Sequence, residues 1–321
     1  MKTLREIGDQ LRANNNYVLV SHSIPDGDSI GSLIGLFWAL KSINKEVCII
    51  IEDNPPPIYS YLNGVDLIKT AEGLDPQWRK VIFLDCSDAG RVGDKTRLFL
   101  KDREYFINID HHTTNELFAQ YNYVDPKAAA TAQIVYELLE EMKIAITPNI
   151  ADPLFAGLVM DTGSFLNTNT SAKTLRIAAN LLELGVDIEK TRNNLFESKP
   201  REEVLLLKEA LKNISFTENG KIAWMVLSFQ DVQAVNGQNL HPEGIINYTR
   251  MIRGVEVGLL FREVEPNIIK IGFRSKGKID VSLIAQKFGG GGHPQAAGAR
   301  QEGQLRDICT KVINAVKDVV K

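Results

Sequence analysis

Cysteine is scarce in this chain. Among its 321 residues only Cys48, Cys86 and Cys309 carry thiols, and they are odd in number and widely spaced. This pattern argues against a disulfide framework and against a zinc site built from cysteine pairs. We therefore expect all three thiols to be reduced and buried.

Long apolar runs are also missing. No run approaches the roughly 18 residues that a membrane-spanning helix requires. Residues 1–6, Met-Lys-Thr-Leu-Arg-Glu, become polar too early for the apolar region of a signal peptide. We therefore expect a cytoplasmic protein that does not associate with membranes.

Charge of one sign does not dominate the chain. It has 37 Lys and Arg residues and 40 Asp and Glu residues, a formal net charge of −3. Wrapping long duplex nucleic acid requires many Lys and Arg contacts to phosphates, so this balance argues against that function. The distribution is uneven, because residues 1–213 hold 23 basic and 30 acidic residues whereas residues 214–321 hold 14 and 10. We expect the C-terminal part to bind anions.

Length and patterning predict two domains of α/β type. At about 150 residues per domain, 321 residues are enough for two hydrophobic cores. In the first half short apolar runs alternate with helical patterns, as in βαβ units around a mostly parallel sheet. The predicted strands are residues 17–21, 46–51, 80–84 and 105–109, and the predicted helices are 29–42, 128–142, 153–159, 171–184 and 186–196. Proline-rich residues 54–57 are expected to form a loop.

The pattern changes near residues 198–200. Residues 201–212 predict a connecting helix, and Asn219-Gly220 predicts a turn. Beyond it, the predicted strands are residues 221–228, 255–261 and 268–273, and the predicted helices are 281–288 and 305–320. We place the domain junction between about residues 187 and 213.

The most informative segment is residues 21–29, Ser-His-Ser-Ile-Pro-Asp-Gly-Asp-Ser, between the first strand and the first helix. Ligands bind at this edge of open α/β sheets. Asp26 and Asp28 can direct carboxylates into a shared space beside His22. The alternative is structural, because Pro-Asp-Gly is a common turn and Ser29 can be an ordinary N-cap.

Further acidic residues and histidines follow other predicted elements. Asp85 directly follows the predicted strand 80–84, and Asp110-His111-His112 directly follows the predicted strand 105–109. Asp161 follows the apolar residues 158–160. Any single one of these is as well explained by a cap or a turn. Several of them at one edge of a parallel sheet favour a functional site.

Metal ions would explain why these side chains converge. Four close carboxylates, Asp26, Asp28, Asp85 and Asp161, would raise one another's pKa unless cations neutralised them. Two divalent ions supply that charge. Carboxylates mixed with imidazoles and no thiolate suit Mn²⁺ best, with Co²⁺, Mg²⁺ and Zn²⁺ left open. Two such ions about 3.5–4 Å apart are typical of phosphoester hydrolysis.

A glycine run marks the C-terminal part. Gly289, Gly290, Gly291 and Gly292 precede His293, and their backbone N–H groups can bind a phosphate. A bare glycine run is more often a flexible connector. The nearby His293, Arg262 and Arg274 favour a phosphate-binding loop. By contrast, Arg250 and Arg253 are expected on a solvated face, and His241 on the ordinary surface.

The motifs occur in a defined order: His22-x-x-x-Asp26-x-Asp28, Asp85, Asp110-His111-His112, Asp161 and the glycine run with His293. This set resembles the DHH phosphoesterase superfamily with a C-terminal DHHA1 domain, and within it the two-domain bacterial nanoRNase/pAp-phosphatase group. The resemblance covers essentially the whole chain. It implies a DHH catalytic domain at 1–186, a linker helix at 187–213 and a smaller α/β DHHA1 domain at 214–321, with the active site in the cleft between the domains.

The resemblance also implies roles for individual residues. One metal would be held by His22, Asp26 and Asp85, and a second by Asp28, Asp85, His111 and Asp161, so that Asp85 bridges the ions. Asp110 would orient a histidine, and His112 would face the substrate phosphate. Substrate would be bound by the glycine run with its neighbours: Gly289, Gly290, Gly291, Gly292, His293, Arg274 and Arg262.

Members of this group degrade very short single-stranded RNA to mononucleotides and remove the 3′-phosphate of 3′-phosphoadenosine 5′-phosphate (pAp). The resemblance implies this activity, with short RNA and pAp as partners, and leaves a homodimer open. Four alternatives remain: a linear dinucleotide phosphodiesterase, a manganese pyrophosphatase, a RecJ-like exonuclease and a nucleotide sensor without turnover. The glycine run argues against the pyrophosphatase, and the chain length against the RecJ-like enzyme.

Overall fold

The computed structural model describes residues 1–71, 78–238, 240 and 244–320, with His293 described by its backbone alone. Within these residues the chain divides into two compact units, Met1–Ser198 and Lys199–Lys321. The division falls inside residues 187–213. That segment is not one helix, because α7 (Ile188–Leu195) belongs to the first unit and α8 (Arg201–Lys212) to the second.

A six-stranded parallel sheet forms the centre of the first unit, in the order β3-β2-β1-β4-β5-β6. Its strands are β1 (Tyr17–Val20), β2 (Val47–Ile51), β3 (Ile68–Thr70), β4 (Lys80–Leu84), β5 (Glu104–Asp110) and β6 (Tyr121–Val124). The order reverses between β1 and β4, so the loops after these strands diverge. This divergence is the position at which open α/β sheets bind ligands.

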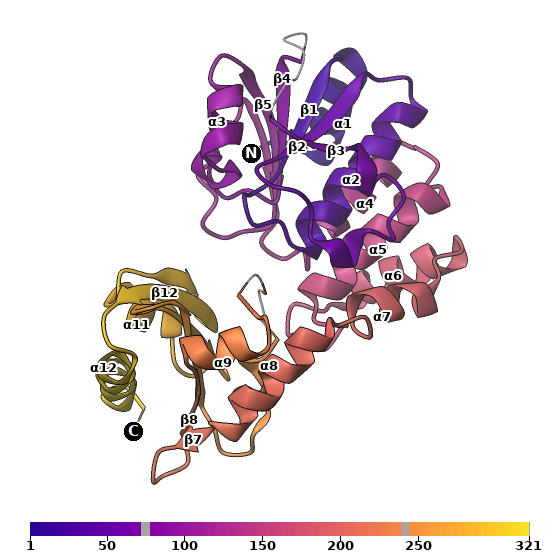
Figure 1. The fold of residues 1–321 in the computed structure, drawn as a ribbon. Coiled ribbons are helices and arrows are strands. Elements are labelled where there is room, and N and C mark those ends of the chain that lie inside the picture. Colours follow the sequence, from indigo (N-terminus) through magenta and orange to yellow (C-terminus); the bar gives the residue numbers. More distant parts are fainter. Residues whose placement is uncertain (72–77, 239, 241–243, 321) are drawn as a thin grey trace. The chain divides into compact units, whose positions relative to one another are not determined.

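Both faces of this sheet are covered, and the strand residues alternate between two cores. Tyr17 and Leu19 of β1 face the larger core, whereas Val18 and Val20 face the smaller one. Helices α1, α2, α4 and α5 pack on the larger core, and α3 lies on the opposite side of the sheet (Figure 1). Strands buried on both faces are apolar throughout, as the sequence pattern of β1 indicates.

The helices of the first unit are α1 (Leu4–Ala13), α2 (Gly27–Ser42), α3 (Asp94–Leu100), α4 (Thr131–Glu141), α5 (Pro148–Asp161), α6 (Ala172–Glu183) and α7, with short 3₁₀ turns η1 (Pro57–Tyr59), η2 (Val65–Leu67) and η3 (Ala89–Val92). Helix α1 was not predicted, although Thr3 and Glu6 form a capping box at its start. Helix α5 begins at Pro148, earlier than the predicted residue 153. Among the described residues, no helix is both long and apolar enough to cross a membrane.

The second unit contains a mixed sheet in the order β11-β12-β10-β9-β8-β7, in which only β8 and β9 pair in parallel. Its elements are α8, β7 (Ser215–Phe216), β8 (Ile222–Leu227), α9 (Phe229–Ala234), α10 (Asn247–Met251), β9 (Val257–Glu265), β10 (Ile268–Ser275), α11 (Val281–Gln286), β11 (Gly291–His293), β12 (Ala296–Glu302) and α12 (Leu305–Lys317). The glycine run was expected to be a loop. Its second half instead forms the edge strand β11, paired antiparallel with β12.

The three cysteines are free thiols. Cys86 and Cys309 are buried as expected, whereas Cys48 is half-buried. Burial raises the pKa of Cys48 and of Cys309 to about 12, so both thiols are protonated near neutral pH.

Candidate metal centre

The loop between β1 and α2 presents the first group of predicted site residues. Asp26 is the N-cap of α2, and its Oδ1 accepts hydrogen bonds from the backbone N–H groups of Asp28 and Ser29, each at 3.0 Å. The structural alternative that made Ser29 the cap is therefore wrong. Because Asp26 ends the loop that follows β1, Asp28 and Ser29 lie in the first turn of α2, next to the carboxyl end of β1.

Ser29 is a member of the site that the sequence did not reveal. Its hydroxyl lies 2.6 Å from Nε2 of His22 and donates to Oδ2 of Asp85 at 2.9 Å. His22 Nε2 itself lies 3.3 Å from the same carboxylate oxygen. The three side chains are buried. The Ser29 hydroxyl therefore holds the imidazole of His22, from the loop after β1, against the carboxylate of Asp85, which follows the neighbouring strand β4.

Asp85 stands directly after β4 in a left-handed backbone conformation, with φ of +59°. This conformation costs a non-glycine residue about 1 kcal/mol or more. Here its backbone N–H donates to the carbonyl of Ile109, and Thr131 Oγ1 donates to its Oδ1 at 3.2 Å. Burial acts to raise the pKa of Asp85, but the hydrogen bond from His22 and the neighbouring imidazoles hold that pKa below its ordinary value.

Asp28 is bound by the N-terminus of α4. Its two carboxylate oxygens accept the backbone N–H groups of Thr131 at 2.6 Å and Ala132 at 2.8 Å. Thr131 therefore contacts two predicted ligands, Asp28 through its backbone and Asp85 through its hydroxyl. Burial, followed by the charges of Asp85, Asp161 and Asp26, raises the pKa of Asp28 well above its ordinary value.

His111 connects the remaining carboxylates. Its Nε2 lies 3.6 Å from Asp85, 3.7 Å from Asp161 and 3.9 Å from Asp28. Its Nδ1 lies 3.3 Å from the carbonyl oxygen of Ala128, an arrangement that commonly orients a metal-binding imidazole. Asp161 is the last residue of α5, and burial together with Asp26 and Asp85 raises its pKa to about 7.

Asp110 holds His112. Its Oδ1 lies 2.7 Å from Nδ1 of His112, and its Oδ2 accepts a hydrogen bond from Asn115 at 2.6 Å. Nδ1 of His112 is also 3.6 Å from Asp85. Burial acts to raise the pKa of Asp110 and to lower that of His112. The contact between the two side chains outweighs burial, so the pKa of Asp110 is lowered and that of His112 is raised. Asn115 was not identified from the sequence, because an asparagine in a polar loop carries no distinctive pattern.

The predicted residues of the first unit form three overlapping groups that could hold a metal ion. These groups are His22, Asp26 and Asp85; Asp28, His111 and Asp161; and Asp85, His111 and His112, with the ligand atoms of each group within 4.8 Å of one another. Asp85 and His111 each belong to two groups. Carboxylates and imidazoles without a thiolate suit divalent ions such as Mn²⁺. Burial, together with the neighbouring carboxylates, raises the pKa of Asp28 and of Asp161. A divalent cation would favour the ionised form of both groups, so the donor set fits divalent metal ions.

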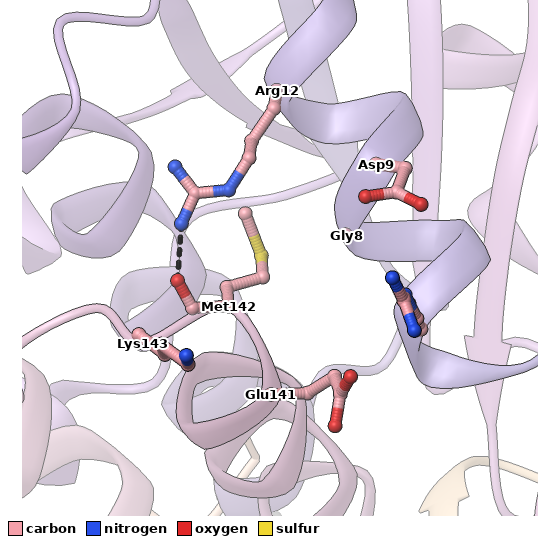
Figure 2. A pocket seen from close by; sticks show the side chains of 7 residues that line it. Gly8, Asp9, Arg12, Glu141, Met142 and Lys143 are labelled. Carbon is pink, nitrogen blue, oxygen red and sulfur yellow. Dashed lines mark hydrogen bonds between the residues drawn. The ribbon is translucent and has the colours of Figure 1, made fainter.

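The cavity shown in Figure 2 lies at the other end of α4. It has a volume of about 310 Å³ and is lined by Arg5, Gly8, Asp9, Arg12, Glu141, Met142 and Lys143. Arg12 donates a hydrogen bond to the carbonyl of Met142, the C-cap of α4 (Figure 2). The helix is thus held at both ends, by Arg12 at its carbonyl end and by Asp28 at its N-terminus. No predicted ligand lines this cavity, so we assign it no part in the metal centre.

The predicted substrate-binding arginines have different surroundings in the second unit. Arg262 is only 7% exposed and donates from Nη1 to the carbonyl of Leu240 at 2.5 Å. Burial lowers its pKa. Arg274, at the end of β10, is half-buried and donates to the carbonyl of Phe273. The structure therefore gives Arg262 an internal role, whereas Arg274 retains exposed surface.

The four glycines of the run are not equivalent. A Cβ at Gly290 would lie 2.1 Å from the carbonyl oxygen of Gly298, and one at Gly292 would lie 2.5 Å from that of Ala296. These two glycines are explained by close pairing with β12. A Cβ at Gly289 or Gly291 would meet no atom within 4 Å. The predictions for the side chain of His293 and for His241 lie outside the described residues.

Comparison with known proteins extends these observations. Residues 16–158 match the DHH family, N-terminal domain, and residues 232–318 match the DHHA1 domain. The "Bifunctional oligoribonuclease and PAP phosphatase NrnA" of Thermus thermophilus is 31% identical over 317 residues, which are 98% of this chain and 94% of that protein.

Two solved structures share the fold. An exopolyphosphatase-related protein from Bacteroides fragilis has a TM-score of 0.92 at 24% identity, covering 98% of this chain and 96% of that one. RecJ of Thermus thermophilus in complex with Mn²⁺ has a TM-score of 0.55 at 13% identity, covering 98% of this chain and 55% of that one. With both domain matches in order and a relative that is similar along nearly its whole length, the chain belongs to the DHH family, in the form that carries a DHHA1 domain.

Proposed function

We propose that this protein is a two-metal phosphoesterase that hydrolyses short RNA oligonucleotides to mononucleotides and removes the 3′-phosphate of pAp. The proposal is supported by the name of the relative from Thermus thermophilus, which pairs these two activities and is similar over 98% of this chain. It is also supported by a donor set that the fold assembles from four different loops and helix ends.

The observation that carries the proposal is the position of Asp85, which is grouped with His22 and Asp26 and also with His111. Shared ligands are expected where two ions lie side by side. We assign His22, Asp26 and Asp85 to one ion and Asp28, Asp85, His111 and Asp161 to the other, with Mn²⁺ the best match to the donors. Two such ions lower the pKa of water and stabilise the attacking and leaving oxygens of a phosphoryl displacement.

The chain's own residues then orient and stabilise the phosphate. Asp110 fixes the ring of His112 through Nδ1 and favours its protonated form. A protonated imidazole facing the phosphate stabilises charge that develops on its oxygens. Ser29 and Thr131 keep the ligands in place, because each hydroxyl donates to Asp85.

The second unit would bind the rest of the nucleotide. We assign this role to Arg274 and to the glycine run with His293. Arg262, which is buried, would support this surface from inside. The support is the exposed part of Arg274 and the open space beside Gly289 and Gly291. The excess of basic residues after residue 213 favours an anionic ligand.

A product analysis would test the proposal. Metal-stripped protein is incubated with and without Mn²⁺ in parallel with short RNA oligomers, pAp, the linear dinucleotide pApA and pyrophosphate, and the products are separated by chromatography. We expect mononucleotides from RNA and AMP from pAp, both only with metal. Phosphate from pyrophosphate alone would contradict the proposal, cleavage of pApA alone would favour the dinucleotide phosphodiesterase, and binding without any product would favour a sensor.

A further inference from the structure

Arg91 lies in η3, the short turn that follows β4 and Asp85. Its carbonyl oxygen accepts a hydrogen bond of 2.7 Å from the backbone N–H of Ser23. Ser23 belongs to the loop that carries His22 and Asp26. The backbone of Arg91 is therefore attached directly to the loop that supplies the first group of ligands.

The side chain of Arg91 is connected to the other ligand loop. Its Nη1 lies 3.4 Å from the hydroxyl of the buried Ser87, to which it donates. The carbonyl of Ser87 in turn accepts a hydrogen bond of 2.8 Å from the backbone N–H of Glu116, in the loop that begins with His111 and His112. Arg91 thus stands between the two loops that carry the imidazoles of the metal centre.

The charge of Arg91 is available to a ligand. The residue is exposed, and no carboxylate of the described residues lies within the 4.0 Å of an ion pair. It is also close to the metal centre, because it follows Asp85 by six residues and its carbonyl oxygen accepts a hydrogen bond from Ser23, the residue after His22.

We propose that Arg91 binds the non-bridging oxygens of the scissile phosphate, together with His112. The inference rests on the proposed function and adds a residue to it. A guanidinium suits this role because its planar N–H groups match two phosphate oxygens at once. The scissile phosphate is favoured over a remote one because hydrogen bonds connect Arg91 to the loop of His22 and Asp26 and, through Ser87, to the loop of His111 and His112.

The experiment compares Arg91→Gln and Arg91→Lys with Arg97→Gln. This control removes another exposed arginine of the same unit, one that is paired with Asp94. Turnover with Mn²⁺ is measured on pAp and on bis(p-nitrophenyl) phosphate, a phosphodiester without a nucleoside. Affinity for inorganic phosphate and for Mn²⁺ is measured by calorimetry, and folding by thermal unfolding.

For Arg91→Gln we expect kcat to fall by on the order of 10²-fold on both substrates, as for loss of one donor to a charged transition state. Phosphate affinity should fall, whereas Mn²⁺ affinity and the melting temperature should stay unchanged. Arg91→Lys should recover part of kcat, and Arg97→Gln should behave as wild type.

Three results would overturn this inference. Unchanged kcat in Arg91→Gln would remove Arg91 from the reaction. A higher KM for pAp alone would place it on a remote phosphate. A matching loss of Mn²⁺ affinity or of folding in both Arg91 variants would make it a structural residue. Failure of the proposed function is distinguishable from all three, because the wild-type protein itself would then not hydrolyse pAp.

Discussion

The raised pKa of Asp161 predicts that the metal-free protein loses stability as the pH rises. Its folded pKa is about 7, against an ordinary value of 3.8. Between these values the carboxyl is protonated in the folded protein and ionised in the unfolded chain. The folded state therefore binds more protons, and the unfolding free energy falls as the pH rises through this window.

The size of the effect follows from the two pKa values. A difference of about 3 units corresponds to roughly 4 kcal/mol in all, of which about 2.5 kcal/mol is lost between pH 5 and pH 8. The raised pKa values of Asp28 and His112 act in the same direction. Asp85 and Asp110, whose pKa values are lowered, matter only below about pH 4, where unfolded carboxyls become protonated.

The assay is urea unfolding of metal-stripped protein at pH 5, 6, 7 and 8. In a Trp224→Phe background the remaining tryptophans, Trp38 and Trp78, both lie in the first unit, so fluorescence reports on the unit that holds Asp161. Asp161→Asn keeps the shape of the side chain and removes its titration. Asp94→Asn is the control, because the Asp94 side chain is 91% exposed.

We expect Asp161→Asn to lose much less stability than wild type between pH 5 and pH 8, with Asp94→Asn parallel to wild type. Calorimetric titration with Mn²⁺ in buffers of different ionisation enthalpy should also show more protons released at pH 6 than at pH 8, because metal binding requires the ionised carboxylate. Parallel pH profiles for wild type and Asp161→Asn would refute the electrostatic account of the cluster.

Three further predictions concern the metal centre, Arg274 and the glycine run. Asp85→Ala should abolish hydrolysis of pAp, because it removes the carboxylate that we assign to both ions, and near-normal turnover would contradict the two-metal assignment. Arg274→Ala should raise KM for pAp more than for bis(p-nitrophenyl) phosphate, and equal effects on both would exclude it as a nucleotide contact. Gly290→Ala should destabilise the second unit by about 1–3 kcal/mol, since its Cβ would lie 2.1 Å from a carbonyl oxygen. Gly291→Ala should leave urea unfolding unchanged and raise KM if the glycine run binds substrate; a destabilisation equal to that of Gly290→Ala would contradict the packing argument.

Local sequence pattern was sufficient for the regular elements with strong periodicity. The predicted limits of β4 and α8 match the structure, because a short apolar run and an amphipathic repeat each define one element. Strand β12, Ala-Ala-Gly-Ala-Arg-Gln-Glu, was not predicted, since it contains no β-branched or aromatic residue. It becomes a strand because it pairs with β10 and β11, and the local sequence pattern of β12 does not predict this pairing.

The same division applies to the candidate site. The residue types were evident from the sequence, because aspartates and histidines at the ends of parallel strands must reach one edge of the sheet. Which of them meet was decided only by the tertiary structure. Ser29 joins His22 to Asp85, and the N-terminus of α4 binds Asp28, through contacts between segments far apart in the chain. A donor atom is a local property of one residue, whereas the position of its partner depends on strand order, register and helix packing.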